Sequence, residues 1–239
     1  MASSPVKWEY QARRVWWAMV DLIFPPRCAG CRSPSQRFCA ACQASIELIE
    51  EPICERCGYP KPHGGDCQQC RNHPYDALDE IRSVAFFDGT LQNALHQLKY
   101  RRDVALADTL AQLMKKHFMA LAIEATALVP VPLSARRLRE RGYNQAALLA
   151  RGLADLTGAP YQPHLLRRTR HTVSQVGLTA SERRDNVQGA FEASRQAAQR
   201  HVLLIDDVCT TGSTLEACAQ ALKRAGAKSV KALTLGRAR

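Results

Sequence analysis

Eight of the ten cysteines in the chain form four CxxC pairs between residues 28 and 70. Two residues between paired thiolates allow one tight turn to aim both sulfurs at a single ion, and four sulfurs complete a tetrahedral zinc shell. A segment this short buries too little apolar surface to fold without such a metal. We therefore expect two closed structural zinc sites and no catalysis at the metal. The predicted ligands are Cys28, Cys31, Cys39, Cys42, Cys54, Cys57, Cys67 and Cys70.

The spacing of the pairs leaves two ways of sharing them between two ions. Successive pairs are separated by 7, 11 and 9 residues, and the two shorter gaps favour consecutive pairing. An interleaved arrangement, in which the first pair shares an ion with the third, stays open. The spacing limits how far apart the pairs can lie, but it does not fix which pairs share an ion. His63 and His73 could replace a cysteine, but with a full cysteine set they are expected to be exposed loop residues. A redox CxxC would start a helix after a strand, whereas proline, glycine and charged residues surround these pairs.

A second candidate site lies in the run from His201 to Leu215. Its apolar start is typical of a parallel strand buried on both faces, and the strand leads to Asp206 and Asp207. The turn Thr210–Thr214 has little side-chain bulk and enters a helix, so its backbone N–H groups could surround a phosphate. Ionised carboxylates beside a phosphate could accept hydrogen bonds from vicinal hydroxyls, which describes a ribose 5-phosphate group. The turn lacks the lysine of a P-loop and the chain has no G-x-G-x-x-G, which disfavours triphosphate hydrolysis and dinucleotide binding.

The elements that would position this run follow an α/β pattern from about Asp76 onward. Because strands alternate with helical crossovers, we expect a mostly parallel sheet flanked by helices, with ligands at the carboxyl ends of the strands. The predicted helices are Gly89–Tyr100 (begun by Asp88), Val104–Ile123, Asn144–Leu156 (closed by Gly158) and Ser213–Arg224 (closed by Gly226). The predicted strands are Ala127–Val131, His201–Ile205 and Ser229–Leu235.

The first residues are expected to form a helix and not a membrane span. The apolar stretch Val15–Phe24 is broken by Asp21 and is shorter than the roughly 20 residues that a span needs. Glu9 before it and the lack of a small-residue cleavage site after it fit a signal peptide poorly. We therefore expect a cytoplasmic protein, in which clustered cysteines favour metal over disulfides. Residues Trp8–Phe24 are predicted to be a docking helix with an apolar face of Trp8, Ala12, Val15, Met19 and Leu22.

Charge is divided unevenly along the 239 residues. A hydrophobic share of 46% is enough for a real core and disfavours disorder. Residues 1–80 carry 9 basic and 10 acidic side chains, and residues 81–239 carry 24 basic and 12 acidic ones, so the α/β part holds the whole formal excess of +11. Such an excess suits a polyanionic ligand or a nucleic-acid backbone.

Several motifs together resemble a known family. The run from His201 resembles the signature of type I phosphoribosyltransferases, which bind 5-phosphoribosyl-1-diphosphate (PRPP). With the CxxC pairs and Leu98-Lys99-Tyr100, the pattern resembles the competence protein F (ComF) family over nearly the whole chain from Cys28. The other matching motifs are Val129-Pro130-Val131-Pro132-Leu133-Ser134, Arg141-Gly142-Tyr143-Asn144-Gln145, Arg167-Arg168-Thr169-Arg170-His171-Thr172, Gln175, Leu178, Arg183, Arg184, Asn186 and Gly189-Ala190-Phe191.

The resemblance implies a type I phosphoribosyltransferase-like domain over residues 76–239, behind a helix (1–25) and a double zinc ribbon (26–75). It implies that the catalytic pair Asp206 and Asp207 holds the ribose hydroxyls, and that a mobile loop over Arg168–Arg184 closes over the site. Mg²⁺ would accompany the diphosphate. Cys209 and Cys218, outside the zinc block, are expected to be packed residues. The implied PRPP contacts are Pro132, Leu133, Ser134 and Arg137 to the diphosphate, and Thr210, Thr211, Gly212, Ser213 and Thr214 to the 5-phosphate.

Two functions of different class fit the resemblance. One is an accessory protein of DNA uptake in natural competence, which binds PRPP and single-stranded DNA and works beside other DNA-uptake proteins. The other is an active phosphoribosyltransferase with an unidentified acceptor, for which the chain shows no base-reading motif. DNA is expected on the basic α/β face, with Tyr100, Tyr143 or Phe191 as stacking partners. The basic residues predicted to bind nucleic acid are Lys99, Arg136, Arg139, Arg141, Arg168, Arg183 and Arg184.

Overall fold

The computed structural model describes residues 15–17, 19–22, 25–34, 36–61, 67–101, 103–120, 125–170, 187 and 189–239. Of the predicted N-terminal helix Trp8–Phe24, residues 15–17 and 19–22 are helical, and the others lie outside the described residues. Most of the predicted mobile loop Arg168–Arg184, together with Arg183, Arg184 and His63, also lies outside them.

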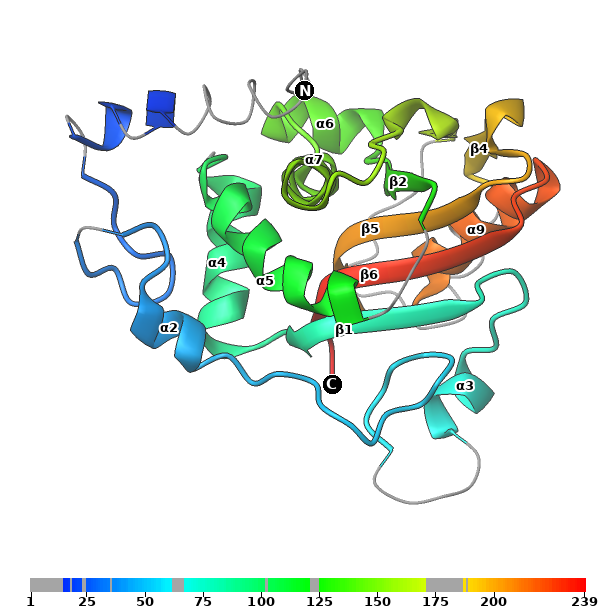
Figure 1. Ribbon diagram of the computed structural model, residues 1–239, viewed down its shortest axis with the longest axis horizontal. Coiled ribbons are helices and arrows are strands. Elements are labelled where there is room, and N and C mark those ends of the chain that lie inside the picture. Colours follow the sequence, from blue (N-terminus) through cyan, green and yellow to red (C-terminus); the bar gives the residue numbers. More distant parts are fainter. Residues whose placement is uncertain are drawn as a thin grey trace, which may run out of the picture.

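The centre of the protein is a four-stranded sheet in which every pair of neighbours is parallel (Figure 1). Its order is β1 (Glu80–Phe86), β6 (Ser229–Arg237), β5 (His201–Cys209) and β2 (Ala127–Pro130). This confirms the predicted mostly parallel sheet. The run Val202–Ile205 of β5 is fully buried, because helices cover both faces of this central strand.

The two central strands are longer than the sequence predicts. β5 continues to Cys209 and β6 to Arg237, since Asp206 pairs with Thr234 and Cys209 with Arg237. The acidic pair therefore lies within a paired strand, two to three residues before its end, and not on a free loop. Strand β1 was not predicted from the sequence, because Glu80 and Arg82 interrupt its apolar pattern.

Helices α4 (Gly89–Tyr100), α5 (Leu106–Ala120) and α7 (Gln145–Thr157) cover one face of the sheet (Figure 1). The other face is covered by α9 (Ser213–Arg224) and an antiparallel pair of short strands, β3 (Leu166–Arg168) and β4 (Phe191–Ala193). All four predicted helices are present, although α5 begins at Leu106 and not at Val104, and residues 121–123 of that prediction lie outside the described residues. Asp88 precedes α4 as expected, but its side chain does not cap the helix and pairs with Arg239 instead. The remaining elements are α6 (Ala135–Arg141) and the 3-10 turns η1 (Pro163–Leu165) and η2 (Arg195–Ala197).

The cysteine block wraps around the edge of the sheet in two parts. The first part, with α2 (Ala40–Ala44), packs against α4, and the second, with α3 (Gln68–Asn72), lies beside β1 (Figure 1). The segment between them runs antiparallel to β1, with Ile49 N–H donating to Val84 O (3.1 Å) and Phe86 N–H donating to Glu47 O (3.0 Å). It therefore covers the backbone groups that an edge strand would otherwise expose.

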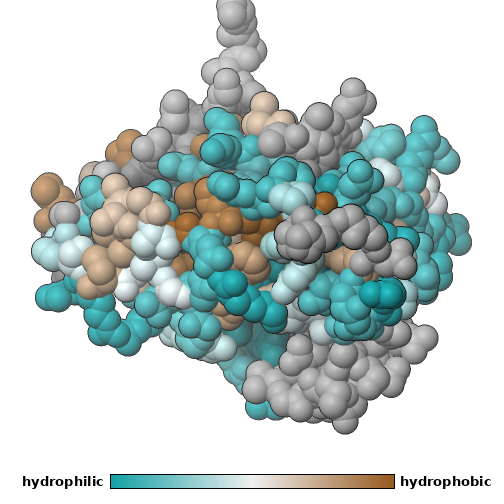
Figure 2. Space-filling view, turned by 90° about the horizontal axis from the view of Figure 1, so that it is seen from below, coloured by the Kyte–Doolittle hydropathy of each residue, from teal (hydrophilic) through white to brown (hydrophobic). Residues whose placement is uncertain are grey.

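Viewed from below, the surface on this side has an apolar area in its middle with hydrophilic areas around it (Figure 2). Helix α6 lies at the opposite side of the protein, at the top of Figure 1. In the described part of the chain, we find no helix with both the length and the apolar character that crossing a bilayer requires.

Candidate functional site

The centre of the candidate site is the acidic pair at the end of β5. Asp207 is buried and its carboxylate forms an ion pair with the ammonium of Lys99, whose side chain is only 17% exposed. Burial and the neighbouring charge of Asp207 raise the pKa of Asp206 well above its usual value. Burial is the largest influence on Asp207 and opposes its ionisation, but the charge and hydrogen bond of Lys99, the hydrogen bond of Asp206 and the charge of Arg141 together lower the pKa of that carboxyl. Asp207 therefore loses its proton more readily than its neighbour Asp206.

Lys99 reaches this pair from the last turn of α4. Its ammonium also lies 5.7 Å from the centre of the Phe87 ring, so it is enclosed between an aromatic face and a carboxylate. Sequence reasoning predicted Lys99 as a contact for nucleic acid. The structure instead places it beside the residues predicted to hold a sugar.

The predicted phosphate loop forms the turn between β5 and α9. Gly212 has a φ of +78°, in the left-handed region that favours glycine, and it directly precedes the first residue of α9. The hydroxyls of Thr211 and Ser213 are 2.8 Å apart, and the backbone N–H of Ser213 points at the Thr211 oxygen at 3.4 Å. The loop thus brings hydroxyls and backbone N–H groups together at the N-terminus of a twelve-residue helix.

A buried carboxylate, Glu216, stands in the first turn of the same helix. It accepts hydrogen bonds at 3.0–3.1 Å from the backbone N–H groups of Asp76, Ala77 and Leu78. These three donors stabilise its charge, and they fix the segment before β1 against the helix that carries the phosphate loop. The sequence analysis did not single out Glu216. Its signal was an acidic residue in the first turn of a helix predicted to bind an anion, which indicates a structural role for that carboxylate.

The loop predicted to contact a diphosphate follows β2 and lies beside the acidic pair. Val131 N–H donates to Ile205 O at 2.9 Å, so the loop starts next to the residue before Asp206. The Ser134 hydroxyl accepts from Arg137 N–H at 3.3 Å and caps α6. The site therefore combines the ends of β2 and β5, as the parallel topology predicts.

The Arg141-Gly142-Tyr143-Asn144-Gln145 motif holds this loop against α4. The Asn144 amide donates to Val131 O at 2.9 Å, and the Tyr143 hydroxyl donates to Leu98 O. Arg141 donates to the Gln145 side chain at 2.9 Å and lies over the Tyr100 ring at 5.1 Å. These contacts explain a motif whose role sequence reasoning left open, because they bring the end of α4, with Lys99, next to the diphosphate loop.

The other predicted nucleic-acid residues separate into two groups. Arg136 and Arg139 are exposed on α6, where Arg136 pairs with Glu140 at 2.8 Å. Arg168 is half-buried, with its guanidinium 5.2 Å from the centre of the Phe191 ring. Phe191 is only 4% exposed, so the prediction that it could stack on a base is wrong, because the ring belongs to the core beneath α9.

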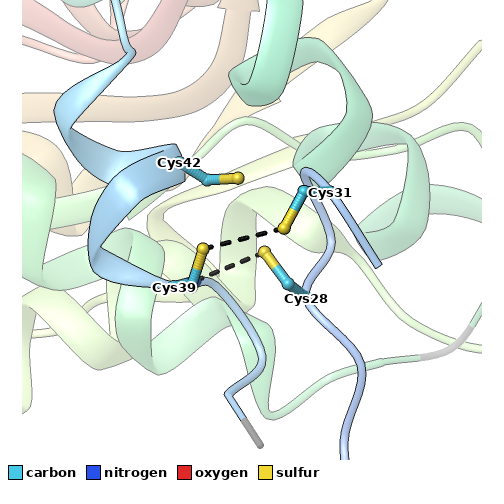
Figure 3. Close-up of side chains that lie close together, drawn as sticks. All are labelled: Cys28, Cys31, Cys39 and Cys42. Carbon is cyan, nitrogen blue, oxygen red and sulfur yellow. Dashed lines mark hydrogen bonds between the residues drawn. The ribbon is translucent and has the colours of Figure 1, made fainter. Parts of the chain in front are cut away.

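The cysteines form two clusters with consecutive pairing. The first contains Cys28, Cys31, Cys39 and Cys42 (Figure 3), and the second Cys54, Cys57, Cys67 and Cys70. Tetrahedral zinc with bonds of about 2.3 Å requires sulfurs about 3.8 Å apart. The Cys31–Cys39, Cys54–Cys70 and Cys57–Cys67 sulfur distances are 3.8, 3.7 and 3.6 Å. Both clusters therefore fit four-sulfur zinc sites, and the favoured consecutive pairing is confirmed.

Backbone N–H groups favour the thiolate form of one ligand in each cluster, whereas burial and the neighbouring thiols raise the pKa of Cys42, Cys57 and Cys70. Burial raises the pKa of Cys28, but N–H groups of Cys39, Cys31 and Gly30 outweigh it and lower the pKa to about 6. In the second cluster, N–H groups of Cys57 and Arg56 likewise outweigh burial and lower the pKa of Cys54 to about 7. The other two cysteines, Cys209 and Cys218, are buried in the core, as expected.

Comparison with known proteins agrees with this architecture. The double zinc ribbon domain family matches residues 19–71, and the phosphoribosyl transferase domain family matches residues 96–239. The DNA utilization protein YhgH of Salmonella typhimurium is 33% identical over 227 residues, and competence protein F of Haemophilus influenzae is 31% identical over 235; each match covers 90% of this chain and 99% of the relative. The chain belongs to the competence protein F family.

Membership of the competence protein F family agrees with the resemblance seen in the sequence. Competence protein ComFC of Bacillus subtilis is 30% identical over 210 residues, with 84% of this chain and 85% of the relative covered. Among solved structures, glutamine PRPP amidotransferase from B. subtilis matches with 22% identity and a TM-score of 0.39, over 54% of this chain and 26% of that one. The two family matches show that this chain combines a double zinc ribbon with a phosphoribosyl transferase domain.

Proposed function

We propose that this protein binds PRPP and single-stranded DNA as an accessory component of DNA uptake in the cytoplasm. The observation that carries the proposal is the acidic pair Asp206 and Asp207 near the end of β5, separated by two residues from a phosphate loop at the start of α9. In this arrangement the acids accept hydrogen bonds from the ribose hydroxyls, and Thr210 to Thr214 surround the 5-phosphate. The names of the relatives, competence protein F and DNA utilization protein, support the part that concerns DNA.

The diphosphate of PRPP would lie by the loop from Pro132 to Arg137, next to Lys99 on α4. Mg²⁺ binds oxygen donors and keeps most of its waters, and the carboxylates and hydroxyls here are donors of that kind. When bound, the ion would neutralise the diphosphate. The chain's own contribution is to hold the ribose at the acids and to place positive charge near the leaving group.

Calorimetric titration of the zinc-loaded full chain with PRPP and Mg²⁺ tests the proposal. Heat that fits one site per chain is expected, and no heat would contradict it.

The second candidate function, transfer to an acceptor, is favoured by the pairing of Lys99 with Asp207, because this pairing places a cation next to the ribose site. If the protein releases diphosphate from PRPP over hours, transfer is supported. If PRPP stays intact in its presence, the activity is binding without transfer.

Replacing Lys99 by methionine is expected to weaken PRPP binding about 10-fold or more, and binding of ribose 5-phosphate much less. A charge-assisted hydrogen bond contributes about 1.5–3 kcal/mol, and only PRPP has the diphosphate that Lys99 would face. Calorimetry with both ligands measures the difference. Lys115→Met, at an exposed position on α5, is the control. Equal losses for both ligands would mean that Lys99 acts through Asp207 alone.

The exposed arginines of α6 are the proposed DNA contacts. Arg136 and Arg139 are exposed, they lie on the side away from the zinc block, and α6 directly follows the diphosphate loop. Replacing both by glutamine is expected to lower the affinity for single-stranded DNA. The slope of log K against log salt should become shallower by about 1.4, since each phosphate contact contributes about 0.7. Fluorescence anisotropy at several salt concentrations measures it, and an unchanged slope would exclude α6 as the DNA site.

A further inference from the structure

The second zinc ribbon lies directly behind the phosphate loop. Tyr75, five residues after Cys70, donates its hydroxyl hydrogen to Thr211 O at 2.9 Å. Its ring also lies under Gly212, where an added Cβ would be 2.7 Å from the Tyr75 hydroxyl and ring edge. One buried side chain from the ribbon thus supports two successive residues of the loop.

Tyr75 is in turn held by the turn that binds the metal. Arg56, between the ligands Cys54 and Cys57, donates from its guanidinium to Tyr75 O. Its own carbonyl accepts from Ile81 N–H at 2.8 Å, which fixes this turn to β1. A path of direct contacts therefore connects the zinc ligands, Arg56, Tyr75 and the phosphate loop.

A buried guanidinium forms a second connection between the same parts. Arg237, at the end of β6, is 1% exposed and donates to Cys57 O at 3.1 Å and to Cys209 Sγ at 3.2 Å. Cys209 is the last residue of β5, immediately before the phosphate loop. The cation thus joins the turn of the second zinc site to the start of that loop.

The first ribbon has different neighbours. Its hydrogen bonds reach α4 and the segment after it: the Thr90 hydroxyl donates to Cys42 O at 2.9 Å, the Gln97 amide to Ala29 O at 3.4 Å, and the Arg37 guanidinium to Asp103 at 2.6 Å. The second ribbon, through Tyr75 and Arg237, is therefore the one whose contacts reach the phosphate loop and the residue before it.

We propose that Tyr75 is a positioning residue through which zinc in the second ribbon and a sugar phosphate in the loop stabilise each other. The proposal rests on the proposed binding of PRPP. If zinc holds Tyr75 in the geometry that the phosphate needs, then by thermodynamic reciprocity the phosphate must raise the affinity for zinc at that site by the same factor. The first zinc site should show no such effect.

The test is a zinc competition against a chelator of known affinity, with and without ribose 5-phosphate. This ligand fills the phosphate loop but lacks the diphosphate that would itself bind zinc. In the full chain, the zinc affinity of one site is expected to rise about fivefold or more, within the usual range of coupling. The variant Cys31→Ser, which disables the first zinc site, shows which site responds. In this variant the second site should still bind zinc more tightly when ribose 5-phosphate is present.

Two tyrosine variants test the role of Tyr75. Tyr75→Phe keeps the ring and removes the hydroxyl bond to Thr211, so the coupling should fall to less than half. Tyr59→Phe is the matched control, because Tyr59 lies in the same ribbon with its ring 5.6 Å from the Arg237 guanidinium. Equal coupling in both variants would exclude the Tyr75 hydroxyl as the connection.

The outcomes separate this inference from the proposed function. If calorimetry shows that the wild-type chain binds ribose 5-phosphate and PRPP while both zinc affinities stay unchanged, the inference is wrong and the proposed function stands. If neither ligand binds, the proposed function is wrong, and the inference falls with it.

Discussion

Replacing Gly212 by alanine is expected to weaken PRPP binding at least about 100-fold while the protein stays folded. The phosphate accepts several hydrogen bonds from the loop, and the loss of two such bonds to a charged group, at about 1.5–3 kcal/mol each, accounts for that factor. Gly212 has a φ of +78°, and its added Cβ would be 2.7 Å from Tyr75. The ring and the loop must therefore move apart, and the bond to Thr211 is disturbed as well.

Gly158→Ala is the matched control for this prediction. Gly158 has nearly the same φ, +77°, but no atom lies within 4 Å of its added Cβ, and it closes α7 away from the loop. Alanine in the left-handed region costs about 1–2 kcal/mol at either position, and Gly212→Ala should lose additional thermal stability because its Cβ meets Tyr75. Calorimetry should then show that only Gly212→Ala loses affinity. Similar affinities in the two variants would mean that the loop does not bind the phosphate.

The parts of the site that follow from the sequence are those encoded by neighbouring residues. The two zinc sites could be predicted because each ligand pair lies within four residues and the gaps within a site are short. The acidic pair could be placed at the edge of the sheet because a fully apolar strand precedes it. A loop of small residues between that strand and a helix with a clear apolar face was predictable for the same reason.

The parts that could not be predicted depend on residues far apart in the chain. Lys99 is separated by more than a hundred residues from its partner Asp207, and a lysine at a helix end is usually exposed. Arg237, close to the C-terminus, would be assigned to the surface from its type, yet it is fully buried beside a zinc ligand. Tyr75 gives no signal in the sequence, because its role depends on how the ribbon wraps around the sheet edge.

The same geometry explains why the ribbons are more than an appended module. The first contributes Cys28, Phe38 and Cys42 to the apolar cluster that contains α4 and α5, and the second contributes Cys57 and Tyr75 to the cluster on the α9 face. Each ribbon therefore completes the core on a different face of the sheet. Metal removal is consequently expected to affect the whole domain and not only the cysteine block.

The single variants Asp206→Asn and Asp207→Asn are expected to change the stability of the fold in opposite directions. The double variant is expected to bind PRPP at least about 100-fold more weakly. The loss follows because each carboxylate accepts hydrogen bonds from the ribose hydroxyls, worth about 1.5–3 kcal/mol each. Calorimetry measures the affinity. An unchanged affinity in the double variant would contradict the whole assignment of the site.

The opposite signs follow from the two shifted pKa values. The folded-state pKa of Asp206 is raised, by burial first and then by the charge of Asp207, so the unfolded chain releases this proton at lower pH than the folded one. Above the ordinary pKa of about 3.9, this group therefore destabilises the fold increasingly as the pH rises toward the raised value. Asp206→Asn removes that penalty, and the unliganded protein should become more stable, by a gain that grows with pH.

Asp207→Asn should have the reverse effect. Against the cost of burial, the charge of Lys99 lowers the pKa of Asp207, so its contribution to stability is fully present above about pH 3.9 and is lost only as the pH falls through the lowered value. The variant also leaves the ammonium of Lys99 without its carboxylate. Between pH 5 and 8, Asp207→Asn should lower the Tm by a nearly constant amount. A change of about 1 kcal/mol shifts the Tm by about 2–4 °C in a chain of this size, so thermal melts can measure the effect of each single variant. Shifts of the same sign in both variants would contradict the opposite pKa shifts of the two acids.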